Sequence, residues 1–263
     1  MDAGIDRFSV MTLNLRFGLA EDGPNAWKHR KKLMPGLFRA YPVDFIGFQE
    51  VNAFQADDLA SILSDYRLVG RRRPAPPFWQ NNIIFFRKEW HVQNPEHFYL
   101  SEMPDIPSRS RHSQWPRQCT MGTFQRMSRK LTCINTHFDF SSSVQTFSAK
   151  LIMKRLKRRP DPVPALLMGD FNAPFDSAPY RVFTDEVAAG ERPGISFRNV
   201  FHDAPCGTHH GFSGKPGKDC IDWILHTTGI KPEKAVIVRE HVGGAYYSDH
   251  FPVVAWFSFS PGA

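Results

Sequence analysis

The stretch that decides the fold is Ala165-Leu-Leu-Met-Gly-Asp-Phe-Asn172. Its first four residues form an apolar run with the length of a buried strand, and an acid and an amide follow at Asp170 and Asn172. Because side chains alternate across a strand, we expect Asp170 and Asn172 on one side and Phe171 on the other. A carboxylate and a carboxamide can therefore meet one ligand at the end of this strand.

A second stretch, Ile134-Asn-Thr-His-Phe-Asp-Phe140, shows the same alternation. The period of two sends Asn135, His137 and Asp139 to one side and the remaining residues, Phe140 included, to the other. His137 can therefore point out of the core.

The segment Ser248-Asp249-His250 precedes the last apolar strand. Neighbours in an extended segment point to opposite sides, so Asp249 is badly placed to orient the ring of His250. Asp222 lies within an apolar strand, where an unpaired charge is costly. A histidine partner would satisfy Asp222 and fix the tautomer of the ring, which predicts a pair between Asp222 and His250.

Two further strands end in polar residues. Alternating apolar residues over 11–17 predict a half-buried strand with Asn14 on its less apolar face, and an apolar strand over 45–48 ends at Glu50. Taken alone, a strand-end acid is usually a cap or turn former. Taken together, eight polar residues gather at several strand ends: Asn14, Glu50, His137, Asp170, Asn172, Asp222, Asp249 and His250. Their oxygen-rich donor set suits a hard cation, Mg²⁺ or Mn²⁺, better than zinc.

The order of elements predicts an α/β protein with mixed sheets. Strands alternate with helices expected near 27–41, 53–63, 144–158 and 177–184, of which the second turns Phe54 inward. Pro35 must either begin a helix or kink one. Strands are expected near 66–70, 82–87, 92–98, 119–124, 131–137, 220–225, 235–239 and 252–259. The proline-rich stretch 104–116 is a candidate functional loop.

The composition favours one domain over residues 1–263. Hydrophobic residues make up 41% of the chain and charged residues 22%, which excludes disordered and fibrous classes. The apolar runs are far shorter than the ~20 residues that span a bilayer, so no membrane span is expected. The N-terminus lacks the pattern of a secretory signal, and the four cysteines match no metal or redox motif. We therefore expect reduced thiols, most of them buried, together with a cytoplasmic location and a monomer.

The net charge of +7 favours anionic partners such as nucleic acid or phosphorylated metabolites. Two basic clusters contribute to it. Arg71-Arg72-Arg73 is either a substrate rim or a plain connection. The cluster at 154–159 falls at the end of a predicted amphipathic helix, where a solvated face is favoured over a phosphate track.

In their order along the chain, the polar strand-end motifs resemble those of the endonuclease/exonuclease/phosphatase superfamily. This superfamily includes DNase I, AP endonucleases, sphingomyelinases and inositol polyphosphate 5-phosphatases. The resemblance runs from about Val10 to Phe257. The matching pieces are LNLRFG (13–18), FIGFQE (45–50), INTHFD (134–139), MGDFNAPF (168–175), IDWIL (221–225) and SDHFPV (248–253). The chain is also similar to a bacterial subgroup of small phosphoesterases, through Asp22-Gly-Pro-Asn25 with Trp27, through Pro116-Arg117, and through GTHHGFSG (207–214).

The resemblance implies a DNase I-like four-layer α/β/β/α sandwich, in which two mixed β-sheets are flanked by helices and the active site lies at one end. It also implies a Mg²⁺ or Mn²⁺ ion held mainly by Glu50, with Asn14 and Asp249 nearby. Asp170 corresponds to the acid that orients or deprotonates the attacking water, and Asn172 to the amide that steadies the water or the phosphate. The remaining catalytic residues implied are the His250–Asp222 pair and His137, which faces the phosphate.

Some positions depart from the pattern of the superfamily. Val51-Asn52 follow the acid motif where AP endonucleases commonly have Thr-Lys, which weakens a DNA-repair function. Cys220 stands where relatives often have arginine, so one phosphate or structural contact of that arginine is missing here. Arg117 is the candidate to replace it. Trp115 and His210, together with His209, form either a substrate wall or a packed aromatic loop.

Three functions follow as hypotheses. The first is a divalent-metal phosphoesterase that hydrolyses a phosphate mono- or diester of a small or medium phosphorylated compound by attack of water at phosphorus. The second is a DNA or RNA nuclease with the same active site. The third, a non-catalytic binding protein, is disfavoured because no metal ligand and neither member of the His–Asp pair is lost.

Overall fold

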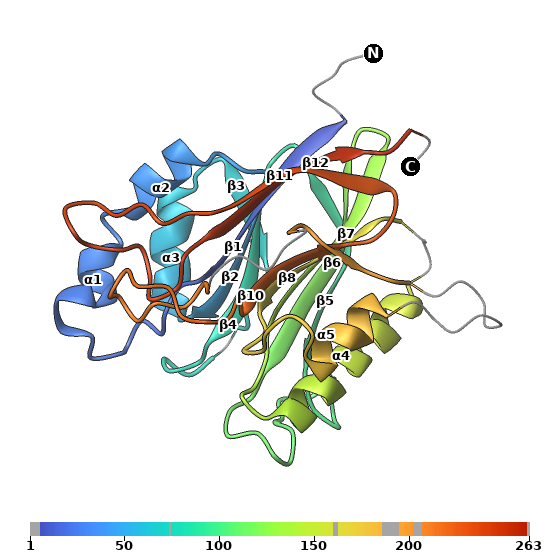
Figure 1. The fold of residues 1–263 in the computed structure, drawn as a ribbon, viewed down its shortest axis with the longest axis horizontal. Coiled ribbons are helices and arrows are strands. Elements are labelled where there is room, and N and C mark those ends of the chain that lie inside the picture. Colours follow the sequence, from blue (N-terminus) through green and yellow to red (C-terminus); the bar gives the residue numbers. More distant parts are fainter. Residues whose placement is uncertain (1–5, 74, 160–162, 186–194, 202–206, 262–263) are drawn as a thin grey trace.

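A computed structural model describes residues 6–73, 75–159, 163–185, 195–201 and 207–261. It contains two six-stranded mixed sheets that lie face to face, with helices on the outer side of each (Figure 1). The predicted fold class, a four-layer α/β/β/α sandwich, is confirmed.

The first sheet has the order β11-β12-β1-β2-β4-β3. In it, β1 pairs in parallel with β2 and antiparallel with β12. The strands are β1 (Arg7–Asn14), β2 (Phe45–Val51), β3 (Tyr66–Val69), β4 (Asn81–Arg87), β11 (Ile230–Ile237) and β12 (Val253–Phe259).

The second sheet has the order β5-β6-β7-β8-β10-β9. Here β7 and β8 are parallel, and β10 runs antiparallel to β8. The strands are β5 (His91–Tyr99), β6 (Gln118–Arg126), β7 (Arg129–His137), β8 (Ala165–Asp170), β9 (Arg198–Asn199) and β10 (Asp222–His226).

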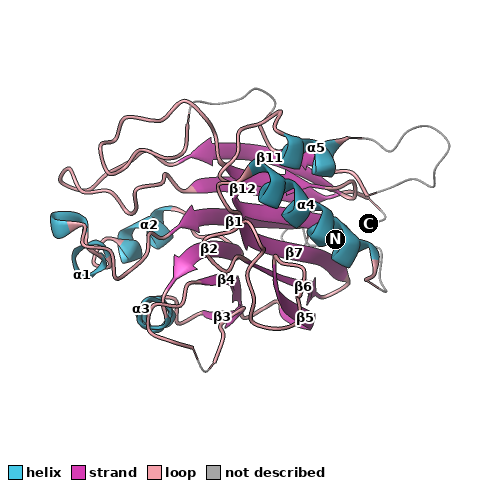
Figure 2. Cartoon of the chain, turned by 90° about the horizontal axis from the view of Figure 1, so that it is seen from below, coloured by secondary structure: helices cyan, strands magenta, loops and turns pink. Residues whose placement is uncertain are grey.

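The helices form the two outer layers (Figure 2). The first sheet is covered by α1 (Trp27–Arg30), α2 (Met34–Ala40) and α3 (Ala53–Ile62), which follow the short 3-10 helix η1 (Gly23–Asn25). The second sheet is covered by α4 (Ser142–Lys157) and α5 (Ala178–Thr184). Apolar side chains fill the space under each helical layer and between the two sheets. Burial of this apolar surface is the main force that holds the layers together.

A pair of buried amides joins the two sheets beside the end that carries the polar motifs. Gln49 Nε2 donates to Asn135 Oδ1 at 2.6 Å, and Asn135 Nδ2 donates to the carbonyls of Phe48 and Ile83, both at 2.9 Å. Both amide side chains are fully buried. Because a buried polar group without a partner is costly, these bonds favour one alignment of the sheets.

Several local predictions were wrong. The helix expected over 27–41 is two helices, and Pro35 lies in the first turn of α2, where its missing N–H is not needed. Phe54 does not face inward but is 39% exposed. Phe140 is 72% exposed rather than buried, because β7 ends at His137 and strand alternation does not continue beyond it. The strand expected near 235–239 begins at Ile230 and ends at Ile237.

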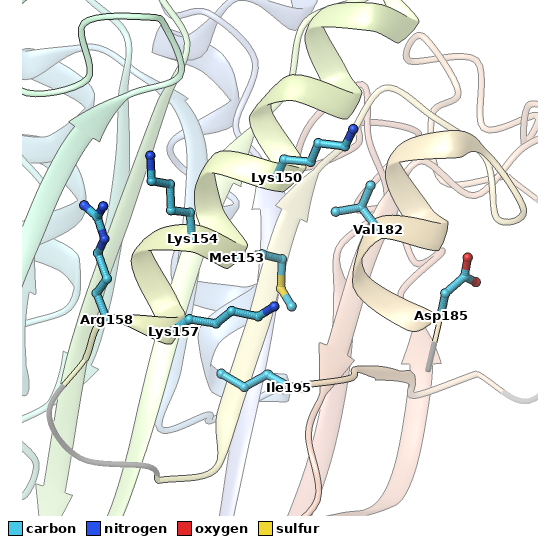
Figure 3. Close-up of a pocket in the computed structure, with 8 residues that line it drawn as sticks. All are labelled: Lys150, Met153, Lys154, Lys157, Arg158, Val182, Asp185 and Ile195. Carbon is cyan, nitrogen blue, oxygen red and sulfur yellow. The ribbon is translucent and has the colours of Figure 1, made fainter. Parts of the chain in front are cut away.

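The basic cluster at the end of α4 divides into two parts. Arg159 forms an ion pair with Glu96 at 2.7 Å, and Arg155 pairs with the same acid at 3.7 Å. Four exposed cationic residues instead border a pocket beside Met153 and Val182, and Figure 3 shows Lys150 and Lys157 extending toward α5 while Lys154 and Arg158 extend away from it. This is the solvated helix face that the sequence predicted.

In the other basic cluster, two residues have structural partners. Arg71 pairs with Asp57, and the guanidinium of Arg72 lies 4.3 Å from the ring centroid of Trp79. These contacts favour the plain connection over a substrate rim.

The described thiols agree with the expectation of buried cysteines. Cys119 and Cys133 are free and buried, and Cys220 is buried. Cys206 lies outside the described residues. None of the helices in the described ranges is long and apolar enough to cross a membrane.

Candidate active site

Strand pairing brings three of the predicted residues side by side at one end of the second sheet. Asp170 at the end of β8 is in register with His137 on β7 and with Asp222 on β10. All three side chains are almost fully buried. The short strand that decides the fold therefore lies at the centre of the site.

The predicted pair between His250 and Asp222 is present, with 2.8 Å between His250 Nδ1 and Asp222 Oδ2. The other ring nitrogen, Nε2, lies 3.8 Å from Asp170 Oδ2. Burial alone would lower the pKa of His250, but the carboxylates of Asp222 and Asp170 raise it to about 10. The ring is therefore held as an imidazolium, with Nε2 aimed toward Asp170.

A second imidazole, that of His137, lies on the other side of Asp170. Its Nε2 is 3.4 Å from Asp170 Oδ2 and 3.1 Å from Asn172 Nδ2. Burial, together with the positive charges of Arg117 and His250, lowers the pKa of His137, so this ring is neutral. Asn172 also donates its main-chain N–H to Asp170 Oδ1 at 2.9 Å, a local contact of the Asx-turn type.

Asn14 connects the two sheets at the site. Its Nδ2 donates to Asp170 Oδ2 at 2.9 Å on the second sheet and lies 3.1 Å from Glu50 Oε1 on the first. Burial and the nearby Asp222 carboxylate raise the pKa of Asp170. Acids from two different sheets are thus within reach of a single amide.

Glu50 adopts an unusual backbone conformation. It has a φ of 62°, in the left-handed region that favours glycine, and it lies where the pairing of β2 with β4 is interrupted by a bulge. The main-chain N–H of Phe17 donates to Glu50 Oε2 at 2.7 Å. Local strain of this kind is common at functional sites, and here it accompanies a carboxylate that faces the second sheet.

Asp249 completes the acidic side of the site. Its Oδ2 lies 3.7 Å from Arg16 Nε and 3.9 Å from His209 Nε2. Arg16 is held in turn by Asp22, with contacts of 3.0 and 2.9 Å. The neighbouring Ser248 hydroxyl donates to the carbonyl of Asn14 at 2.6 Å, which ties this segment to the end of β1.

Of the residues predicted to contact substrate, Arg117 lies next to the site. It is buried, and its Nη1 is 3.0 Å from His137 Nδ1. Its guanidinium lies 5.6 Å from the ring centroid of Phe140. Trp115, two residues earlier, is 60% exposed. Arg117 therefore lies between His137 and the exposed ring of Phe140, and Trp115 is an exposed aromatic side chain in the same loop.

The two adjacent histidines have different surroundings. The ring of His210 stacks on Phe251 with 3.9 Å between centroids, and its Nδ1 accepts the N–H of Gly214. Of the two candidate histidines, His209 lies beside the site: it is half exposed and packs edge-on against His250 at 4.8 Å. Arg16 was not among the predicted site residues, although its position two residues after Asn14 was a signal for it.

The donor set fits a hard divalent cation. Glu50, Asp170 and Asp249 supply carboxylate oxygens. Asn14 turns its Nδ2 donors toward Glu50 and Asp170, and its Oδ1 accepts the N–H of Arg16 at 2.9 Å. Ligand atoms of Asp170, Asp222 and His250 lie within 4.8 Å of one another, and so do those of His209, Asp249 and His250, although His250 in its charged form has no lone pair to offer. Asp222 Oδ1 is buried and has no hydrogen-bond partner among the described residues. Because buried carboxylates repel one another, a cation would stabilise the cluster.

The facing mixed sheets and this acid–histidine cluster define a DNase I-like phosphoesterase fold. The sequence profile of the Endonuclease/Exonuclease/phosphatase family matches residues 11–250, and the chain belongs to this family, whose members are hydrolases that act on phosphate esters. No curated protein matches the chain.

Solved structures show the same fold. A family member from Bacteroides vulgatus is 26% identical with a TM-score of 0.86, over 97% of this chain and 99% of its own. One from Bacteroides thetaiotaomicron is 25% identical with a TM-score of 0.84, over 97% and 95%. A mannosyl-6-phosphatase from Bacteroides thetaiotaomicron is 24% identical with a TM-score of 0.84, over 96% and 100%.

Proposed function

We propose that this protein is a divalent-metal-dependent phosphoesterase that hydrolyses a small or medium phosphorylated compound by attack of water at phosphorus. Asn14 carries the proposal, because it contacts Glu50 on one sheet and Asp170 on the other within 3.1 Å. That contact brings the proposed metal ligands and the proposed water-orienting acid into one site. The similar fold of a mannosyl-6-phosphatase supports a small phosphorylated substrate.

Each side chain has a proposed part in the reaction. Glu50, Asn14 and Asp249 would hold Mg²⁺ or Mn²⁺, which when bound neutralises charge that develops on the phosphate oxygens. Asp170 accepts a hydrogen bond from the attacking water and holds it against phosphorus. Asp222 fixes His250 so that the imidazolium Nε2 can stabilise the negative charge of the transition state. His137 and Asn172 donate to further phosphate oxygens.

The proposal includes a reducing, cytoplasmic setting for a monomeric enzyme. The free, buried thiols of Cys119 and Cys133 support such a setting.

The first test is removal and return of the metal. Chelator is expected to abolish hydrolysis, and Mg²⁺ or Mn²⁺ to restore it, because the bound ion would offset the repulsion between the site carboxylates and the phosphate oxygens. The assay is phosphate release from a panel of sugar phosphates, inositol phosphates and phosphodiesters, run beside nicking of plasmid DNA and degradation of RNA. Undiminished hydrolysis in excess chelator would contradict the metal requirement. Fastest cleavage of plasmid or RNA, falling steeply with salt, would favour the nuclease instead.

A second prediction concerns Arg117. Arg117→Ala is expected to raise KM by roughly 10–150-fold, because a charged hydrogen bond to phosphate contributes roughly 1.5–3 kcal/mol. Arg109→Ala is the matched control, since Arg109 lies in the same loop and bonds the carbonyl of Ser113. Initial rates over a range of substrate concentrations give both constants. If both variants keep the wild-type KM and kcat, Arg117 does not contact the substrate.

A further inference from the structure

Arg30 is a buried cation that the proposed reaction does not use. It ends α1 and is 1% exposed, and it is enclosed by the aromatic rings of Trp27 and Phe212, with guanidinium-to-centroid distances of 5.5 and 5.4 Å. Arginine is rarely buried to this degree unless it is paired; here Nε and Nη1 have partners, whereas Nη2 has no hydrogen-bond partner among the described residues.

Its guanidinium holds three separate segments of the main chain. Nε donates to the carbonyl of Asn25 at 2.6 Å. Nη1 donates to the carbonyl of Leu15 at 3.1 Å and to that of Tyr247 at 2.7 Å. Residue 15 follows β1 and residue 25 ends η1, and residue 247 is far from both in the chain. One side chain therefore fixes the relative positions of all three.

The carbonyls of Leu15 and Tyr247 are close in the chain to the acidic side of the site. Leu15 lies between Asn14 and Arg16, and Tyr247 precedes Asp249 by two residues. The third carbonyl belongs to η1, whose preceding residue, Asp22, binds Arg16. Arg30 thus holds the backbone from which Asn14, Asp249 and the Arg16–Asp22 pair extend.

The charge of Arg30 also acts on the site. Burial lowers the pKa of Arg30 to about 10, while the negative charges of Asp249, Asp22 and Glu50 oppose that change, so the group remains charged at neutral pH. Its hydrogen-bond partners among the described residues are neutral carbonyls. An apolar side chain could fill the space between the two rings without the cost of burying a charge. We therefore attribute the planar donors of Arg30 to holding the three carbonyls, and its charge to attraction by the acids of the site.

We infer that Arg30 is a positioning residue, which holds the loops of Asn14, Asp22 and Asp249 in the arrangement that binds the divalent cation. This inference rests on the proposed function, because the cation is the one assigned to that site. Removal of a residue that supports metal ligands typically lowers metal affinity or activity by roughly 10–100-fold.

The test compares Arg30→Met with Arg159→Met. Arg159 is a matched control, because its side chain is 4% exposed and binds Glu96 and the carbonyl of Asn94, on the outer part of the second sheet. Both changes remove one buried charge, and both are expected to lower Tm. Mn²⁺ binding is measured by calorimetry without substrate, and kcat/KM is measured on the fastest-cleaved compound of the panel.

The expected result is that Arg30→Met weakens Mn²⁺ binding and kcat/KM by roughly 10–100-fold, whereas Arg159→Met changes both less than threefold. Arg30→Lys keeps the charge but not the planar fork, so it should recover only part of the loss. Wild-type Mn²⁺ affinity in Arg30→Met, or full recovery in Arg30→Lys, would overturn the inference.

If Arg30→Met does not fold, Mn²⁺ binding is compared between Arg30→Lys and Arg159→Lys instead. Equal effects of these two variants on Mn²⁺ binding would overturn the inference about Arg30. Failure of the wild-type protein to show metal-dependent hydrolysis would instead refute the proposed function. The two failures are therefore distinguishable.

Discussion

Asp170→Asn is expected to lower kcat by roughly 10³-fold while the protein stays folded. The carboxylate accepts hydrogen bonds from Asn14 Nδ2 and from the N–H of Asn172, and it lies within 4 Å of both site imidazoles. Asparagine keeps the shape but removes the negative charge that would hold water against phosphorus. One of the two accepted hydrogen bonds is lost, which costs about 1 kcal/mol, and removal of a buried charge offsets part of that cost.

The measurement is steady-state hydrolysis with saturating Mg²⁺, together with thermal unfolding. Asp44→Asn is the control, because Asp44 also accepts several hydrogen bonds, from Ser9, Trp90 and Arg126. Asp44 precedes β2, whereas Glu50 lies near the end of that strand, so this acid lies away from the site. The control should lose stability but keep kcat. An Asp170→Asn enzyme within tenfold of wild type would rule out the role assigned to this carboxylate.

His250→Ala is expected to lower kcat by roughly 10²–10⁴-fold. The change removes the imidazolium whose Nε2 faces Asp170 and leaves Asp222 buried without its hydrogen-bond partner. A stability loss of about 1–3 kcal/mol is therefore expected as well. Unfolding must be measured beside activity, so that kcat is read only where the variant is folded.

Two companion variants separate catalysis from stability. His226→Ala removes another buried histidine, at the opposite end of β10 from Asp222, and should leave kcat unchanged. Asp222→Asn keeps the packing but no longer fixes the charged ring. Because Asp222 would act only through His250, the double variant Asp222→Asn/His250→Ala should be no slower than His250→Ala alone. Fully multiplicative losses would show that Asp222 acts independently of the ring.

Much of the site could be predicted from short-range patterns. Strand alternation correctly directed Asp170 away from Phe171, which packs in the core, and excluded Asp249 as the partner of His250. The cost of burying an unpaired acid identified Asp222 as that partner. These predictions succeed because alternation and burial depend on residues that are neighbours in one strand.

Alternation failed where a strand ended. Phe140 lies three residues past the end of β7, and its exposure follows from leaving the sheet. For Glu50 the sequence predicted only a position at a strand end, and its left-handed φ at a bulge was not predicted. Between His209 and His210, only the packing of His210 on Phe251 decided which imidazole lies beside Asp249.

By itself, the sequence determined the alternation of strands and helices, the polar strand ends and the oxygen-rich character of the donor set. Only the tertiary structure decided that Asn14 meets Glu50 and Asp170 at once, and that Arg30 holds the loops around them. The reason is physical: each of these contacts joins residues from different sheets or loops. Their distances are set by how the buried faces of the two sheets pack, which no local pattern records.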